Sequence, residues 1–389
     1  MKKKIKKIGL HEPKFTSKEI KYVNEAINST WVSTSGNYID KFEYNIKKYV
    51  GTKYAIACIN GTVALQISLL VSGVSEGDEV IAPSITFIAP INAIKYNNAE
   101  PIFMDANKNF NIDENKTIKF IQEETIFKNG STYNKKTKKI IRAIIIVHVF
   151  GFPCDVEKLV KLCKKRNIKI IEDASESLGS KYKNNYLKNR MTGNIGDISC
   201  ISFNGNKIIT SGSGGIILTN NKRLADRARY LIFQAKDNSI RYIHNEIGYN
   251  YSQTNLQAAL GLAQLEKIRH ILKNKQLLHK IYCKEINNIN GLSIIKEFKE
   301  SKPNYWLNIL KVDKKQFKKN KEYLLKKFHK HNIFVRPVWQ PNHLQKKYKK
   351  NQTYNIKNAN ILHAESLCLP SSYHLSYTDI KKILQILNE

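Results

Sequence analysis

A strand–helix–strand pattern between residues 143 and 173 limits the folds that this chain can adopt. The apolar run 143–150 predicts a buried strand, and residues 155–166 place their apolar side chains on one face of a helix. A second apolar run over 168–173 ends in two acids. Two strands joined by a helix lie parallel in one sheet, so the pattern predicts an α/β fold with a mostly parallel, buried sheet.

Other segments of the chain extend this pattern. Three earlier apolar runs predict further strands, at 55–59, 80–82 and 102–104. Residues 106–140 are rich in Lys and Asn, which predicts a surface excursion with one short helix.

The helical pattern over 256–271 predicts one long helix that leads out of the sheet region, and further strands and helices follow it. We therefore predict two domains. Residues 1–260 form an N-terminal arm and a large domain, with a mixed, mostly parallel sheet between helices, and residues 261–389 form a smaller C-terminal α/β domain.

The charge balance is extreme, because 65 Lys and Arg residues against 32 Asp and Glu residues give a net charge of +33. Such a charge is typical of proteins that bind nucleic acid, anionic membranes or polyanionic substrates. The lysines are scattered, however, and do not alternate with aromatic residues as a base-stacking surface requires. This favours solvated lysine faces and makes nucleic acid an unlikely partner.

The sequence does not indicate a membrane protein, a secreted protein or a metal-binding protein. The chain contains no apolar run of the ~20 residues that cross a bilayer and no secretory signal at its start, so we expect a cytoplasmic protein without membrane contact. The six cysteines form no CxxC pair and no Cys/His cluster with zinc spacing. We expect reduced, buried thiols and no metal site.

Ligands of parallel sheets bind at the carboxyl ends of the strands, and three features there could carry chemistry. Asn60-Gly61-Thr62 opens a helix, where free N–H groups could bind a phosphate, although such a sequence is commonly a plain turn. Asp173 could cap the next segment or face a ligand cation. Lys207 lies in a turn before a glycine-rich loop, although a single lysine is usually a surface residue.

These three features are more informative together than each is alone. A phosphate-binding turn, an acid at a strand end and a lysine are the three groups that pyridoxal 5′-phosphate (PLP) requires. The lysine binds the cofactor covalently, and the acid keeps the ring nitrogen protonated so that the ring withdraws electrons.

With these residues in place, the chain closely resembles the DegT/StrS group of PLP-dependent nucleotide-sugar aminotransferases, which have fold type I. The resemblance runs from Leu10 nearly to the end of the chain. It rests on ten stretches in the same order, which begin at Leu10, Trp31, Asn60, Pro83, His148, Glu172, Ser202, Gly248, Asn255 and Arg336.

The resemblance implies roles for individual residues. Lys207 matches the Schiff-base lysine, which also moves the proton during amino transfer. Asp173 matches the partner of the ring nitrogen, Glu176 the residue near the ring hydroxyl and Phe87 the aromatic that stacks on the ring. The residues that match phosphate contacts are Gly61, Thr62 and Ser202.

Three further positions concern the partner subunit and the substrate. Asn250 matches a phosphate contact supplied by the partner, which implies a homodimer with shared active sites. Arg336 and His343 match a loop near the sugar-nucleotide site, although either could be structural. Ser252 stands where the family commonly has Arg, which puts a contact from the partner subunit in doubt.

The resemblance implies a transfer of the amino group from an amino acid, expected to be L-glutamate, to the 4-keto carbon of a nucleotide-linked 6-deoxy sugar. The motifs look most like the branch that acts on UDP-4-keto-6-deoxy-N-acetylhexosamine, in bacillosamine and legionaminic acid pathways of surface glycan biosynthesis. The alternatives are a GDP-sugar 4-aminotransferase and a 3-keto-sugar aminotransferase. A different class, suggested by the charge, is a nucleic-acid-binding protein with an inactive transaminase fold.

Overall fold

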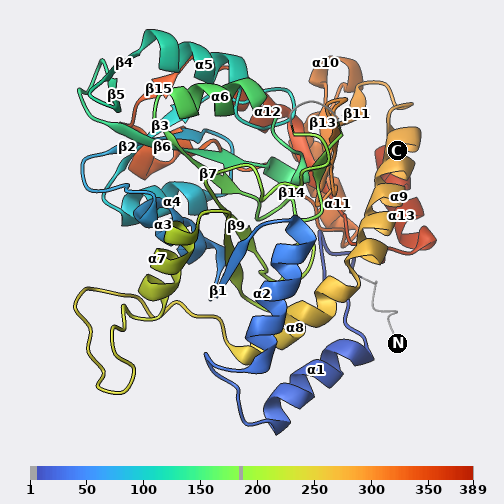
Figure 1. Cartoon of the computed structure of the whole chain (residues 1–389). Coiled ribbons are helices and arrows are strands. Elements are labelled where there is room, and N and C mark those ends of the chain that lie inside the picture. The colour runs from blue at the N-terminus through green and yellow to red at the C-terminus, as the bar shows by residue number, and fades with distance from the viewer. Residues whose placement is uncertain (1–6, 184–186, 389) are drawn as a thin grey trace.

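The structure is a computed structural model that describes residues 7–183 and 187–388. The basic start at Met1–Lys4, and with it the first six residues of the predicted large domain, lies outside the described residues. Figure 1 shows a large domain built around one twisted sheet and a smaller domain beside it. The predicted α/β class and its two-part architecture are confirmed.

An eight-stranded sheet forms the centre of the large domain. Its order is β1-β10-β9-β7-β6-β2-β3-β15, in which β10 is antiparallel to both of its neighbours and the remaining pairs are parallel. The strands are β1 (Tyr54–Cys58), β2 (Glu79–Pro83), β3 (Glu100–Met104), β6 (Ile141–Val147), β7 (Lys169–Asp173), β9 (Ile198–Ser202), β10 (Gly215–Thr219) and β15 (Thr353–Tyr354).

Helices cover both faces of this sheet, which explains why its strands read as continuous apolar runs. One face carries α3 (Gly61–Val71), α4 (Ile88–Tyr96) and α7 (Lys222–Ile232). The other carries α5 (Glu114–Glu123) and α6 (Glu157–Lys165). The helices α1 (Ser17–Asn28), α2 (Asn37–Val50) and α8 (Asn255–Glu266) pack together beside β1.

The small domain has a four-stranded antiparallel sheet of order β11-β13-β16-β14. Its strands are β11 (Leu292–Ile294), β13 (Asn308–Val312), β14 (Arg336–Pro337) and β16 (Ser366–Leu369). Its helices are α9 (Ile268–Ile286), α10 (Lys314–Phe317), α11 (Lys321–Lys330), α12 (Asn358–Glu365) and α13 (Tyr377–Asn388).

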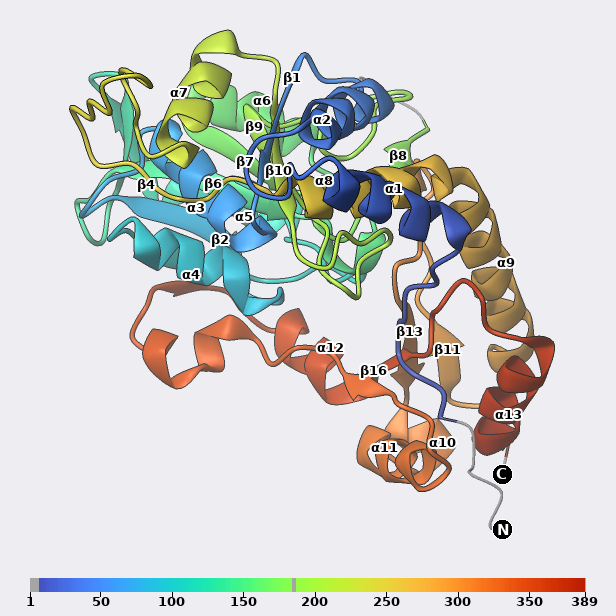
Figure 2. The same ribbon diagram turned by 90° about the horizontal axis from the view of Figure 1, so that it is seen from below.

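Several segments tie the two domains together. Ile8 of the N-terminal arm forms a bridge with Ile333 of the small domain. The strand β15 joins the large sheet beside β3, and Figure 2 shows its segment passing below α4. A third link is the short pair of β8 (Lys181–Tyr182) with β12 (Ser301–Lys302).

Two expectations differ from the structure. Residues 106–140 contain, besides α5, a hairpin of β4 (Thr125–Lys128) and β5 (Ser131–Asn134), and they bury Phe110 and Phe120 in the core, so they are not only a surface excursion. The helical pattern over 256–271 belongs to two helices, α8 and α9, which meet at Lys267. Apolar periodicity continues through such a bend, so it does not reveal the break.

Candidate active site

An interdomain pocket lies at the carboxyl ends of β7 and β9, and has a volume of about 580 Å³. The large domain contributes the first turn of α3, the end of β7 and the turn after β9. The small domain contributes β14 and the segment before β13. This is the sheet edge at which α/β proteins bind ligands.

Lys207 enters the pocket from the turn after β9. Its backbone N–H donates to the carbonyl of Asn204 at 3.0 Å, which closes the turn and directs the side chain inward. The Nζ atom lies 3.4 Å from Oε1 of Glu176 and 4.4 Å from the centre of the Trp306 ring. The amine is thus held between a carboxyl group and an aromatic face.

Glu176 is a buried carboxyl group that faces this amine. Its other oxygen, Oε2, accepts the N–H of Phe150 at 2.8 Å. Burial raises the pKa of Glu176 to about 7, against the opposing charge of Lys207. The group therefore gains or loses a proton near neutral pH.

Asp173, the last residue of β7, lines the same pocket. Its Oδ1 accepts the N–H of Ser175 at 3.0 Å. Burial raises the pKa of Asp173, whereas the contact with Ser175 and the charge of Lys207 act to lower it. A cation that enters the pocket would complete the pairing of this carboxylate.

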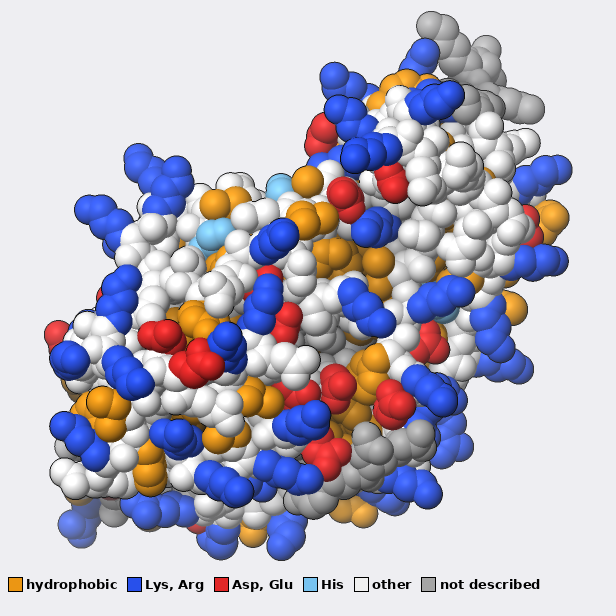
Figure 3. Space-filling view, turned by 90° about the horizontal axis from the view of Figure 1, so that it is seen from above, with side chains coloured by type: hydrophobic (Ala, Val, Ile, Leu, Met, Phe, Trp, Pro, Cys, Tyr) orange, Lys and Arg blue, Asp and Glu red, His pale blue; other side chains and the backbone are white. Residues whose placement is uncertain are grey.

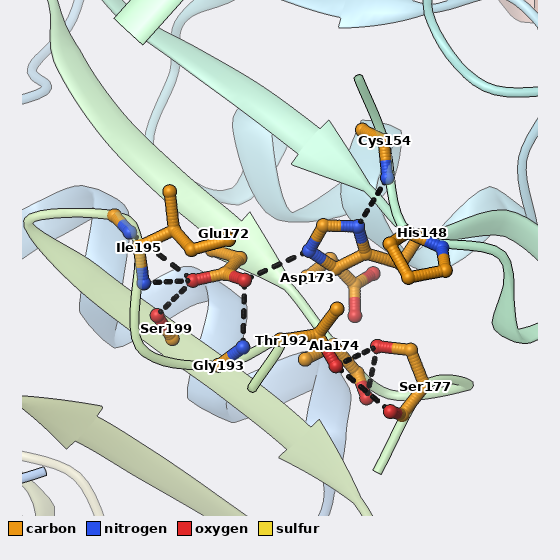
Figure 4. A network of polar contacts seen from close by, with 12 residues as sticks. His148, Cys154, Glu172, Asp173, Ala174, Ser177, Thr192, Gly193, Ile195 and Ser199 are labelled. Atoms are coloured by element: carbon orange, nitrogen blue, oxygen red, sulfur yellow. Dashed lines mark hydrogen bonds and ion pairs between the residues drawn. The ribbon is translucent and has the colours of Figure 1, made fainter. Parts of the chain in front are cut away.

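Glu172, the neighbouring residue, points to the other side of β7 and does not line the pocket (Figure 4). It accepts hydrogen bonds from His148 Nε2 at 2.8 Å and from Ser199 Oγ at 2.9 Å. It also accepts three backbone N–H groups, those of Gly193, Ile195 and Gly196.

Hydrogen bonds determine the direction of the pKa shift of Glu172 and the tautomer of His148. Burial acts to raise the pKa of Glu172, but the contacts with His148 and the backbone outweigh it and lower that pKa. The N–H of Cys154 donates to His148 Nδ1 at 3.0 Å, so the ring proton lies on Nε2.

The first turn of α3 provides a cradle for an anion. The Asn60 side chain caps the helix by accepting the N–H of Val63, and the N–H groups of Gly61 and Thr62 have no partner within a helix. A Cβ atom on Gly61 would lie 2.7 Å from the Cβ of Ser202, so only glycine fits between this turn and β9. Gly61, Thr62 and Ser202 all line the pocket.

These groups fit pyridoxal 5′-phosphate. The helix start suits a phosphate, the Asp173 carboxylate suits a protonated ring nitrogen, and the amine of Lys207 suits an aldehyde. The pocket volume also lies in the range of small-molecule sites.

The remaining predicted residues lie in different places. Phe87 is half exposed in the pocket wall, at the start of α4, and Arg336 is an exposed residue of the same wall. His343 does not line the pocket, because it packs near Phe103. Asn250 is exposed on the loop after α7 and also lies outside this pocket, so its contribution to a partner's site stays a prediction.

Sequence reasoning missed four residues of the pocket wall. Three are aromatic: Phe150 stacks on Trp339 with ring centres 4.6 Å apart, and Trp306 stacks beside both. The fourth is His11, whose ring nitrogens are buried without a hydrogen-bond partner. His11, Phe150 and Trp339 fall within the matching stretches that begin at Leu10, His148 and Arg336, but no role was assigned to them, because aromatic residues in apolar runs are read as core residues. Trp306 lies outside all of these stretches.

The fold and the pocket define a PLP-binding enzyme of fold type I. Residues 13–388 match the DegT/DnrJ/EryC1/StrS aminotransferase family. The chain belongs to this family and is a PLP-dependent sugar aminotransferase.

Several relatives cover nearly the whole chain. GDP-perosamine synthase of Escherichia coli O157:H7 is 40% identical and aligns over 99% of both chains. GDP-perosamine synthase of Caulobacter vibrioides is 32% identical over 98% of both. Among solved structures, the aminotransferase PseC of Helicobacter pylori has the same fold, with a TM-score of 0.87 and 23% identity over 98% of both chains.

The surface charge has no single focus on the face that Figure 3 shows. Lysine and arginine side chains are spread over this face, with acidic side chains between them. No helix within residues 7–183 and 187–388 is long and apolar enough to cross a membrane. The same described residues contain no cluster of His, Cys, Asp and Glu that could hold a metal ion.

Proposed function

We propose that this protein transfers an amino group from L-glutamate to the 4-keto carbon of a nucleotide-linked 6-deoxy sugar. The observation that carries the proposal is the convergence of Lys207, Asp173 and Glu176 in one pocket beside the start of α3. Bound PLP would carry the amino group between the two substrates and withdraw electrons from the reacting carbon.

The residues of the chain have distinct parts in this proposal. Lys207 Nζ holds the cofactor and then takes and returns the proton at the reacting carbon. Asp173 holds a proton on the ring nitrogen, since a buried carboxylate without a cation is costly. Glu176, at 3.4 Å from Nζ, orients the amine and can share its proton because its pKa is near neutrality.

For the nucleotide, we propose guanosine diphosphate. The relatives that are 40% and 32% identical over nearly the whole chain are both named GDP-perosamine synthase. These names favour the GDP-sugar alternative over the UDP-sugar prediction, which rested on short motifs. The exposed Arg336 in the pocket wall suits the diphosphate of either substrate.

We also propose that the enzyme acts as a homodimer. The loop between α7 and α8 exposes several large apolar side chains, namely Ile240, Tyr242, Ile243 and Ile247. The same loop carries Asn250, which the family resemblance assigns to the partner's phosphate site. A second copy of the chain would cover these side chains and complete both pockets.

The first test is the absorbance spectrum of the purified protein with PLP, before and after addition of glutamate. We expect a protein-bound cofactor band that glutamate shifts to the pyridoxamine form, and no such band in Lys207→Ala. GDP-linked and UDP-linked 4-keto-6-deoxy sugars are then offered separately, and restoration of the original band identifies the acceptor. A spectrum that glutamate leaves unchanged would contradict the proposed amino transfer, and restoration by the UDP-sugar alone would reject GDP.

A further inference from the structure

Trp306 of the small domain contacts the turn that carries Lys207. It lies just before β13, is 3% exposed and lines the pocket. Its Nε1–H donates to the carbonyl of Asn206 at 2.6 Å, which is the peptide group directly before Lys207. The face of its ring lies 4.4 Å from Lys207 Nζ. One side chain thus contacts both ends of the lysine residue.

Trp306 is itself held rigidly. Its backbone N–H donates to Oδ1 of Asn304 at 2.8 Å. The Asn304 amide donates in turn to the carbonyls of Glu176 and Leu178, at 2.9 and 3.0 Å. The carbonyl of Trp306 accepts the buried amine of Lys275 at 2.6 Å. Asn304 therefore links the backbone of Trp306 to the segment that carries Glu176, the acid partner of Lys207.

The amine of Lys207 lies between two groups that attract it from different domains. Glu176 approaches from the end of β7, and the electron-rich face of Trp306 approaches from the small domain. A cation over the face of an indole ring is stabilised, and the attraction is stronger where water is excluded. A lysine that moves a proton must return to one place in each cycle, and small misplacements of such a group cost much of the rate.

We propose that Trp306 is a positioning residue for Lys207. Its indole face holds the amine beside Glu176, and its N–H fixes the peptide from which the side chain extends. This inference rests on the proposed function, because it presumes that Lys207 is the reacting amine. It assigns to the small domain a part in catalysis besides forming the pocket wall.

The test compares three variants of the full chain. Trp306→Phe keeps an aromatic face and deletes the N–H, whereas Trp306→Leu deletes both. Tyr305→Leu is the matched control, because Tyr305 is the buried neighbour whose ring stacks on His279 at 3.8 Å and does not line the pocket. Thermal unfolding of each apoprotein shows how much each change destabilises the fold.

Two measurements report on the reactivity of Lys207. In the first, PLP is mixed with apoprotein, the bond to the lysine is reduced with borohydride at timed intervals, and the modified Lys207 peptide is measured by mass spectrometry. In the second, the half-reaction with glutamate gives kcat and KM. For Trp306→Leu we expect both the capture rate and kcat to fall by about 100-fold, with KM changed less than about 3-fold. Trp306→Phe should recover about tenfold of that loss.

The outcomes separate the two proposals. If the wild-type protein forms no reduced bond at Lys207, the proposed function is wrong. If the wild-type protein forms it and Trp306→Leu behaves like Tyr305→Leu in both rates, only the positioning role is wrong. A loss that appears in KM alone, with unchanged capture, would also reject positioning and assign Trp306 to substrate binding.

Discussion

Glu172 and Asp173 are consecutive acids at the end of β7, both are buried, and the structure surrounds them differently. Glu172 accepts five hydrogen bonds, and its pKa is lowered despite burial. Asp173 faces the pocket, and burial raises its pKa. The first carboxylate is satisfied by the protein itself, whereas the second requires a ligand.

The difference follows from the geometry of a strand. Successive side chains point to opposite faces, so adjacent acids on β7 cannot share surroundings. The face of Glu172 meets the loop 193–196, which supplies three N–H groups. The face of Asp173 meets the cavity between α3 and the turn of Lys207. We therefore expect substitutions of Glu172 to alter stability and substitutions within the pocket to alter activity.

The largest effect should come from Lys207→Ala. Removal of the amine deletes both the attachment of the cofactor and the proton carrier, so we expect amino transfer to fall by about 10⁴-fold or more. Thermal unfolding of the apoprotein should change little, because the lysine's contacts are confined to the pocket. Lys222→Ala on α7, where the lysine is exposed, is the control and should keep full activity. Comparable turnover by Lys207→Ala and the wild type would assign the chemistry to another residue.

Asp173→Asn should have the second largest effect. The amide cannot keep a proton on the ring nitrogen, so we expect kcat for the half-reaction with glutamate to fall by about 10²- to 10³-fold. Stability of the apoprotein should be unchanged or higher, because an unpaired buried charge is removed. Stopped-flow absorbance and chemical unfolding measure the two quantities. A stability loss without a change in kcat would place Asp173 in the same class as Glu172.

Glu172→Gln should show the opposite pattern. An amide cannot accept all five hydrogen bonds, and its own NH₂ group would face N–H donors, so we expect the free energy of unfolding to fall by about 3 kcal/mol. The rate per folded molecule should stay within about threefold of the wild type. Urea unfolding of the apoprotein and active-site-normalised kinetics test this. The control is Glu76→Gln in an exposed loop, which should leave both unchanged. Unaltered stability of Glu172→Gln would refute the structural role.

This contrast shows which parts of the structure could be predicted from the sequence. Apolar runs mark strands, and the residues that follow parallel strands gather at one edge, so Asp173 and Lys207 could be placed together from local patterns. The five donors around Glu172 could not be predicted, because they depend on where the loop 193–196 packs. Trp306 and Trp339 were missed for the same reason, since the small domain brings them to the pocket.

The last prediction concerns Glu176, and its effect should depend on pH. Its pKa is about 7 in the folded protein, against an ordinary value of 4.5 that we assign to the unfolded chain. Between these values the folded state binds more protons than the unfolded state, so this group makes stability fall as pH rises from about 4.5 to about 7. Glu176→Gln removes the titration, and the variant should gain stability relative to the wild type across that window, by up to about 3 kcal/mol above pH 7.

Thermal unfolding of both apoproteins from pH 5 to pH 8 measures this difference. Other titrating groups are common to the two proteins and cancel in the comparison. A stability difference that is constant from pH 5 to pH 8 would mean that the pKa of Glu176 is not raised in the folded protein and that the group is ionised throughout this range. It would then resemble Glu172, as a carboxylate stabilised in its charged form, and the amine of Lys207 would be the partner that stabilises it. A difference that grows with pH identifies Glu176 as a group that exchanges a proton near neutrality, beside the amine proposed to move one.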